Sequence, residues 1–155
     1  MAGNMVRRLF TPEEANQRLP LVQVIVQDIV DLYQDVQSRQ ARIESVKRRR
    51  GESRPSRLYS EELDQMEEEL QRDQERLAAF VRELHELGIE FKDPVLGLVD
   101  FPSEMDGRVV YLCWKLGEPE VKFWHEIQAG FASRQALFVE LTVGDDLLGD
   151  ELQAD

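Results

Sequence analysis

The side chains best suited to chemistry in this 155-residue sequence gather between Gly97 and Arg134. A histidine beside carboxylates can act as a metal ligand or as a general base. This stretch contains one of the two histidines, the single cysteine, both tryptophans and several carboxylates. The candidate residues for a ligand or partner site are Asp100, Cys113, Glu118, Trp124, His125, Glu126 and Arg134.

Two interpretations of His125 remain open. We favour a core or rim imidazole that is hydrogen-bonded to the backbone, because no HxH or ExxH spacing defines a set of ligands. In the alternative, Asp100, Glu118 and His125 bind a divalent metal ion while Arg134 holds an anionic group. No catalytic motif of known mechanics is present, so we do not favour an enzyme, and no cofactor is predicted beyond that alternative metal.

Cys113 and Trp124 are weaker candidates. A cysteine nucleophile needs a neighbouring base and a lowered thiol pKa, whereas the expected neighbour of Cys113 is the carboxylate of Asp100, which raises it. Trp124 falls on the mixed face of the expected sheet, where it either lines a pocket or partner surface or joins the core.

An antiparallel sheet is expected to position these residues, because the apolar period changes to two after Ile89. Asp106-Gly107 is typical of a type I′ turn, which pairs Asp100 with Cys113. The three expected strands cover residues 96–101, 108–116 and 121–126.

A second turn, near Glu118-Pro119, is expected to pair Leu112 with His125 and Trp114 with Phe123. On this register His125 lies on the apolar face that packs against the helices, and Asp100 lies on the opposite face. A slip of one residue in either turn would exchange the faces of the strand beyond it.

Two long helices precede the sheet. Thr11-Pro12-Glu13-Glu14 is a helix start, with Thr11 as N-cap and Glu14 completing a capping box. Apolar heptads run from Val22 to Val46 and from Leu63 to Leu87, and Gly88 is placed to end the second helix in a Schellman motif.

The two heptad runs match in reverse order, which predicts an antiparallel helical hairpin resembling a coiled coil. Each run has one charged interruption, Arg39 and Asp73, and these fall opposite each other. A polar pair on an apolar seam fixes the register of the helices. The apolar surface is wider at the open end of the hairpin than two helices need, so the sheet should cover it there.

The predicted fold is therefore α+β, with a long hairpin packed at its base on a small three-stranded antiparallel sheet. One domain covers residues 1–139, with the hairpin at about 12–88 and the sheet module at about 89–139. Residues 140–155 carry six acidic side chains and no basic one, and are expected to be a solvated tail.

The net charge of −12 argues against binding of nucleic acid or of an anionic membrane by the molecule as a whole. No stretch could span a bilayer and no secretion signal is apparent, so a cytoplasmic location is expected. The hairpin tip, near residues 48–59, is the exception in charge. Its basic residues, with those just before it, are Lys47, Arg48, Arg49, Arg50, Arg54 and Arg57.

The blocks GLVDFP, LCWKLGE, FWHE and GF..R, all between Gly97 and Arg134, resemble the Domain of Unknown Function 2203 family, as does the opening RLFTPEEANQRLPLV. The resemblance covers nearly the whole chain. It implies a small prokaryotic protein of no established activity. It also suggests that Asp100, Glu118, His125 and Arg134 belong to one site, since the fold does not need these four groups.

The function expected first is a non-catalytic interaction or regulatory domain that binds an unknown protein partner or a second copy of itself. The metal- or anion-binding protein described above is the first alternative. The second is binding of RNA or the ribosome through the arginine-rich tip, although nucleic acid is disfavoured by the overall charge and by the scarcity of aromatic residues there.

Overall fold

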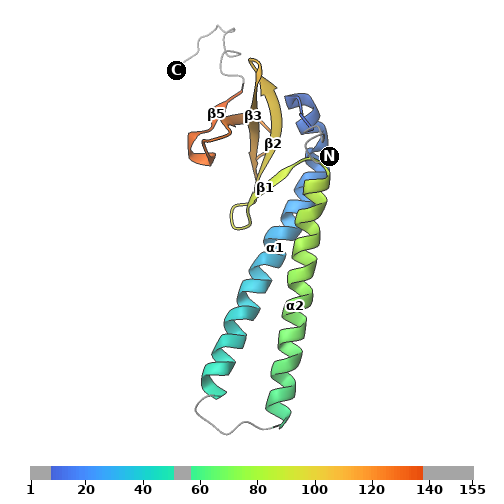
Figure 1. Cartoon of the computed structure of the whole chain (residues 1–155), viewed down its shortest axis with the longest axis vertical. Helices are drawn as coiled ribbons and strands as arrows, with labels where there is room; N and C mark the ends of the chain where they lie inside the picture. Colours follow the sequence, from blue (N-terminus) through green and yellow to red (C-terminus); the bar gives the residue numbers. More distant parts are fainter. Residues whose placement is uncertain (1–7, 51–56, 138–155) are drawn as a thin grey trace, which may run out of the picture.

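The computed structural model describes residues 8–50 and 57–137. Two long helices form an antiparallel hairpin, and a five-stranded antiparallel sheet lies at its open end (Figure 1). The α+β class is therefore confirmed. The elements are α1 (Pro12–Arg50), α2 (Arg57–Glu86), β1 (Glu90–Asp93), β2 (Leu98–Met105), β3 (Arg108–Lys115), β4 (Phe123–Glu126), the 3-10 turn η2 (Phe131–Ser133) and β5 (Gln135–Ala136). No described helix has the length and apolarity needed to cross a membrane.

The predicted helix ends are confirmed. The Thr11 N–H donates to Glu14 Oε1 and the Glu14 N–H donates to Thr11 Oγ1, each at 3.0 Å, which is a capping box. After α2, Gly88 has a φ of +86°, and the N–H of Ile89 donates to the carbonyl of Leu84 at 3.0 Å, as a Schellman motif requires.

The antiparallel register of the hairpin is also confirmed. Arg39 Nε lies 3.1 Å from Asp73 Oδ2, so the two charged interruptions do meet. Arg39 contacts a second carboxylate as well, with its Nη1 2.9 Å from Glu69 Oε1. At this point of the seam, the guanidinium group of Arg39 thus contacts two carboxylates of α2.

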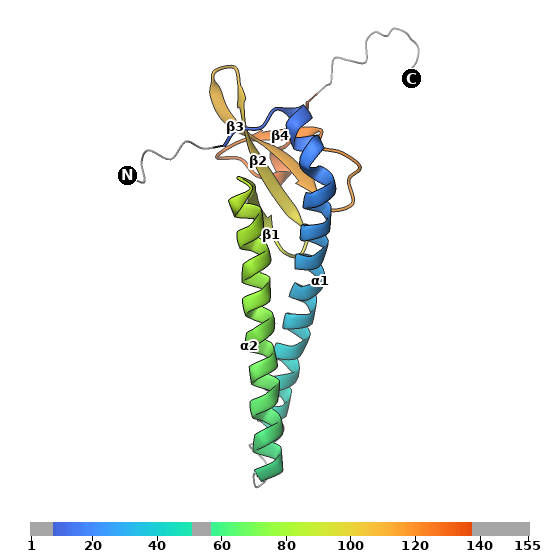
Figure 2. The same cartoon turned by 90° about the vertical axis from the view of Figure 1, so that its right-hand side faces the viewer.

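The core lies where the sheet meets the open end of the hairpin. Figure 2 shows α1 continuing past the end of α2 and alongside the sheet. Burial of this apolar surface is the main source of stability of the fold. The buried core residues come from α1 and the segment before it, from the end of α2 and from the sheet: Phe10, Ala15, Leu19, Val22, Ile25, Val26, Ile29, Val30, Leu84, Ile89, Val99, Phe101, Leu112, Trp114 and Val121.

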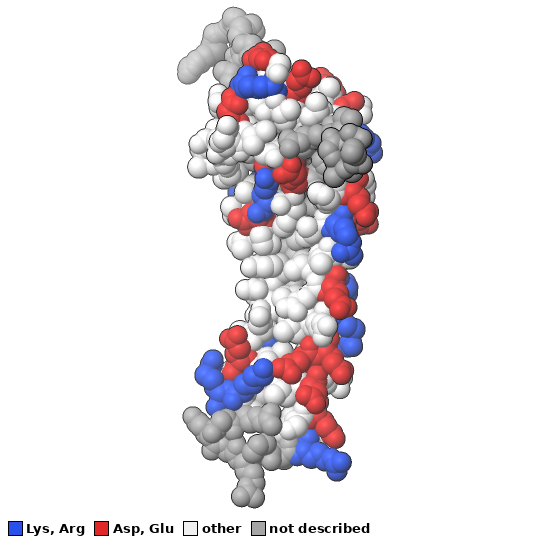
Figure 3. Space-filling view, viewed as in Figure 1, with Lys and Arg blue, Asp and Glu red and all other residues white. Residues whose placement is uncertain are grey.

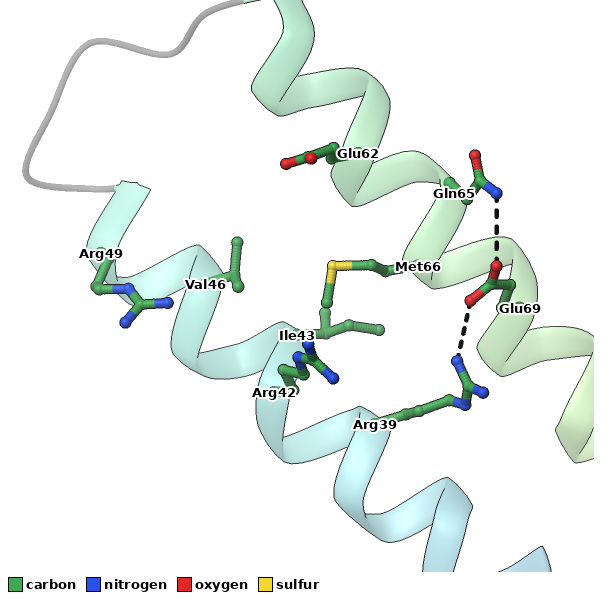
Figure 4. Close-up of a pocket in the computed structure, with 9 residues that line it drawn as sticks. All are labelled: Arg39, Arg42, Ile43, Val46, Arg49, Glu62, Gln65, Met66 and Glu69. Carbon is green, nitrogen blue, oxygen red and sulfur yellow. Dashed lines mark hydrogen bonds and ion pairs between the residues drawn. The ribbon is translucent and has the colours of Figure 1, made fainter.

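Toward the tip, the facing side chains of the two helices leave a groove of about 610 Å³ (Figure 4). Its apolar residues are Ile43, Val46 and Met66, and Arg42 and Arg49 border it from α1. On the face shown in Figure 3, acidic and basic side chains lie next to each other near the tip. The expected tip, residues 48–59, falls partly outside the described residues, as do the N-terminal residues 1–7 and the acidic tail 140–155.

The sheet has five strands rather than the predicted three. The predicted type I′ turn is confirmed, with positive φ at Asp106 (54°) and Gly107 (79°), and it pairs Asp100 with Cys113. The two strands that the sequence did not predict, β1 and β5, have four and two residues, too short to show an apolar period.

The register predicted for the strand after the second turn is wrong by one residue. His125 pairs with Tyr111, and Leu112 pairs with Trp124. The ladder ends before the turn, because the N–H of Lys115 donates to the carboxylate of Glu118 at 3.0 Å instead of to β4. The residues of β4 therefore lie on the opposite faces from those expected.

The connection between β3 and β4 is fixed by α1. Asn16 accepts a hydrogen bond from the N–H of Val121 at 2.7 Å and donates from Nδ2 to the carbonyl of Val121 at 3.1 Å. This contact joins residues that are 105 positions apart in the chain. It holds Val121 two residues before β4 begins.

Candidate functional site

The corrected register brings Asp100, Cys113 and His125 together on the face of the sheet that points away from the helices. They come from three adjacent strands, β2, β3 and β4. His125 Nε2 lies 3.2 Å from Asp100 Oδ1, and one ligand-type atom from each residue lies within 4.8 Å of the other two. All three side chains are buried. We call them the Asp–Cys–His cluster.

The His125 ring is held in a defined orientation. Its Nδ1 is 2.8 Å from the backbone carbonyl of Glu126, and because a carbonyl only accepts, Nδ1 carries the proton of that hydrogen bond. The ring packs edge-on against Tyr111, with 5.6 Å between the ring centroids. This leaves Nε2 directed at Asp100. The imidazole is bonded to the backbone, as the favoured prediction has it. It also lies next to a carboxylate, as the alternative requires.

The carboxyl group of Asp100 is held where ionisation is costly. Burial raises its pKa above the usual value, although His125 and Lys92 act in the opposite direction. Lys92 Nζ lies 3.9 Å from Asp100 Oδ2. The native protein therefore binds a proton at Asp100 more tightly than the unfolded chain does.

Cys113 is a protonated thiol in this environment. Burial, and then the charge of Asp100, raise its pKa to about 12, whereas Arg134 acts in the opposite direction. The carboxylate of Asp100 neighbours this thiol and raises its pKa, as predicted. Such a thiol is a poor nucleophile at neutral pH, and it becomes a thiolate only if a cation replaces its proton.

A cavity of about 140 Å³ adjoins the Asp–Cys–His cluster. All three cluster residues line it, and so does Lys92 on β1, a strand that the sequence did not predict. Lys92 Nζ is 3.2 Å from Glu90 Oε1 and 4.7 Å from the centroid of the Tyr111 ring. The other lining residues are Leu98, Tyr111, Ile127, Ala129, Gly130 and Phe131.

Glu118 and Arg134 form an ion pair beside the cluster instead of joining it as ligands. Arg134 Nη1 donates to Glu118 Oε1 at 3.1 Å, and a second hydrogen bond joins Nη2 to Oε2. Burial opposes ionisation of Glu118, but the hydrogen bonds from Arg134 and Lys115 prevail and lower its pKa below the usual value. The expected metal set of Asp100, Glu118 and His125 is thus not the set that converges.

The Arg134 guanidinium is also stacked between two aromatic rings. Its central carbon lies 4.0 Å from the centroid of Phe123 and 4.2 Å from that of Phe131. Arg134 also acts on the Cys113 thiol, whose pKa it lowers against the larger effect of burial. Through Arg134, Glu118 is therefore connected electrostatically to the cluster. Glu118 and Arg134 are two of the four residues that were expected to share one site.

Trp124 and Glu126 lie apart from the cluster. The register places Trp124 opposite Leu112, on the face that packs against the core, and not on the mixed face where it was expected. The Glu126 side chain forms an ion pair with Arg108 where β3 begins and β4 ends, with Arg108 Nε 3.0 Å from Glu126 Oε1. Only the backbone carbonyl of Glu126 contacts the cluster, through His125.

Comparison with known proteins identifies a family. The family model described as "Uncharacterized conserved protein (DUF2203)" matches residues 8–137. This range contains both helices, all five strands and every residue of the cluster. No curated protein and no solved structure matches the chain.

Proposed function

The chain belongs to the DUF2203 family of uncharacterized conserved proteins, and from this premise we propose that it binds a divalent metal ion of the zinc type through Asp100, Cys113 and His125. The observation that carries the proposal is the convergence of an imidazole nitrogen, a carboxylate oxygen and a sulfur within 4.8 Å of one another. Within the described ranges, this is the one set of three such side chains that lie so close.

The donor set favours zinc over magnesium or calcium. A thiolate is a soft ligand that selects zinc and similar transition metals, whereas magnesium and calcium prefer oxygen. A doubly charged cation bound to one thiolate, one carboxylate and a neutral imidazole has no net charge, which suits a buried site. Three protein ligands also leave one tetrahedral position, as in catalytic zinc centres.

The surroundings of the cluster support the same role. A histidine ligand usually donates its second N–H to a carbonyl or carboxylate, as His125 does to the carbonyl of Glu126. Lys92 and Arg134 each place a positive charge next to a group that must be ionised, Asp100 and Cys113 respectively. Because the thiol binds its proton tightly, metal binding releases that proton and strengthens as the pH rises.

The test is a titration of the metal-free, full-length protein with Co²⁺, followed by competition with Zn²⁺. We expect one equivalent of Co²⁺ to produce cobalt–thiolate charge-transfer absorption, which Zn²⁺ then removes. Asp100→Asn and Cys113→Ser each change a direct ligand and should weaken binding by at least about tenfold, which is the lower end of the cost of losing an outer-shell partner.

Asp100→Asn is an informative variant because an amide N–H can still donate to His125 Nε2, so the fold should persist. Glu104→Gln, the same type of change at an exposed position on β2, is the matched control and should bind Co²⁺ normally. Absence of the charge-transfer band in the wild-type protein, or equal affinity in Asp100→Asn, would contradict the proposal.

Self-association through α1 is a second candidate function, within the expected class of interaction domains. One exposed stripe of α1 carries Asp28, Asp31 and Asp35 and then, toward the tip, Arg42 and Arg49. Such a stripe is complementary to a second copy of itself in antiparallel orientation, with Asp35 facing Arg42 and Asp28 facing Arg49. The groove of about 610 Å³ beside Arg42 and Arg49 lies on the same side.

Light scattering at low and high salt tests this second candidate. We expect a weak dimer that dissociates as salt increases, because exposed ion pairs are screened. Asp35→Arg should abolish dimerisation, and adding Arg42→Asp to it should restore the dimer. A monomer at low salt, or no rescue by the double variant, would exclude this arrangement.

A further inference from the structure

We propose that the metal centre binds a short aliphatic monocarboxylate, which occupies the fourth metal position and is held by the ammonium group of Lys92. This inference rests on the proposed metal function. It starts from the shared cavity, because Asp100, Cys113, His125 and Lys92 line the same space of about 140 Å³. A ligand on the metal that extends into this space would thus lie beside the lysine.

The size of the cavity limits the part of the ligand that enters it to a few heavy atoms. A water molecule in the liquid takes roughly 30 Å³, so the space corresponds to about four or five waters. A carboxylate with two to four carbons has this size. A nucleotide or a sugar phosphate is too large unless most of it remains outside.

Lys92 provides the charge that an anion needs. It is the one cationic residue among those that line the cavity in the described structure, and its side chain is 40% exposed, which places it at the edge. It lies 3.9 Å from Asp100 Oδ2. When Asp100 shares its negative charge with a metal ion, this attraction weakens. The ammonium group keeps its contact with Glu90 at 3.2 Å and can then contact a second anion in place of Asp100.

The remaining lining distinguishes among small anions. Leu98, Ile127 and Phe131 present apolar surface, which suits a short hydrocarbon chain and not a second polar group. Glu90 contacts Lys92 at 3.2 Å and accepts hydrogen bonds from the Tyr111 hydroxyl, so one negative charge already lies near the entrance. A dianion such as phosphate would be repelled by Glu90 more strongly than a monoanion.

The experiment uses the full-length protein loaded with Co²⁺ and titrated with acetate, propionate and phosphate. We expect saturable changes in the cobalt d–d absorption with acetate and propionate. Propionate should bind more tightly because its additional carbon contacts the apolar lining. Phosphate should bind at least about tenfold more weakly than propionate, a difference typical of a mismatched charge.

Lys92→Met tests the role of the ammonium group and keeps a long side chain over Tyr111. It should weaken propionate binding by about tenfold. This is measured at Co²⁺ concentrations that keep the site full, because losing the positive charge beside Asp100 also weakens Co²⁺ affinity. Lys122→Met removes the same charge from an exposed lysine that does not line the cavity and should change neither affinity.

The outcomes separate the two proposals. If no Co²⁺ binds, the proposed metal function itself fails. If Co²⁺ binds but its spectrum does not respond to any carboxylate, the metal function stands and the carboxylate inference is wrong. Equal binding of phosphate and propionate, or unchanged propionate affinity in Lys92→Met, would also overturn the inference.

Discussion

Single residues at the site differ most in how their charge is balanced. Glu118 is neutralised by Arg134, which is itself stacked between Phe123 and Phe131, whereas Asp100 faces a histidine and, at 3.9 Å, a lysine. These surroundings move the two carboxyl pKa values in opposite directions, down for Glu118 and up for Asp100. Ionisation of Glu118 therefore stabilises the fold. Ionisation of Asp100 destabilises it unless a cation is bound.

The ion pair of Glu118 should make part of the stability depend on pH. The native pKa of Glu118 lies below its usual value of 4.5, so the stabilisation is complete above that value and is lost as the pH falls through the native pKa. We expect Glu118→Gln to lower the free energy of unfolding by about 1–2 kcal/mol at pH 7. The difference from the wild type should shrink near pH 3.

Urea unfolding of the metal-free protein at pH 7 and at pH 3 measures this difference. Glu120→Gln, at an exposed position two residues away, is the control and should behave as the wild type. An equal loss of stability at both pH values would mean that the ion pair is not its source.

At the scale of elements, each helix end is built from a short local motif. The capping box at Thr11 and the Schellman motif at Gly88 satisfy backbone groups that have no partner within the helix. Gly88 also directs the chain from α2 into β1, which carries Lys92. The geometry of this single turn therefore positions one wall of the cavity.

Replacing Gly88 by Ala should destabilise the protein by about 1–2 kcal/mol, because its φ of +86° is unfavourable for residues with a Cβ atom. The added Cβ would also lie 2.9 Å from Cδ of Arg8, so that side chain must shift. Thermal unfolding measures the effect. Gly130→Ala is the matched control, since its φ is −128° and no atom lies within 4 Å of the added Cβ, and it should leave the midpoint unchanged or slightly higher.

At the scale of the whole molecule, stability is concentrated at the open end of the hairpin. The core joins the first part of α1, the end of α2 and one face of the sheet. Farther out, α2 has Leu63 as its one buried residue before Leu84. The part of the hairpin that extends beyond the sheet toward the tip, which we call the shaft, is therefore held together by a narrow apolar seam. Ion pairs such as Arg39–Asp73 and Lys47–Glu67 also join its two helices.

This difference predicts a gradient of hydrogen exchange along α2. Amides in residues 77–86, which pack near the sheet, should exchange by global unfolding, whereas those in residues 61–72 should open locally and exchange faster. Exchange measured by mass spectrometry in the monomer, at high salt, tests this expectation. Equal protection along the whole helix would indicate that the shaft and the core unfold as one unit.

The sequence by itself determined the features that depend on neighbouring residues. The heptads, the capping box, Gly88 and the Asp106-Gly107 turn each act over a few positions, so their pattern could be recognised directly. The pairing of Arg39 with Asp73 followed from the same seam. The effect of Asp100 on the Cys113 thiol followed from the first strand pairing.

Only the tertiary structure decided the position of His125 and the contribution of Lys92. The register of β4 depends on Glu118 capturing the N–H of Lys115 and on Asn16 of α1 holding Val121. The second of these contacts joins distant parts of the chain, and no local pattern encodes it. Because side chains alternate along a strand, a shift of one residue moved His125 from the core face to the face of Asp100 and Cys113.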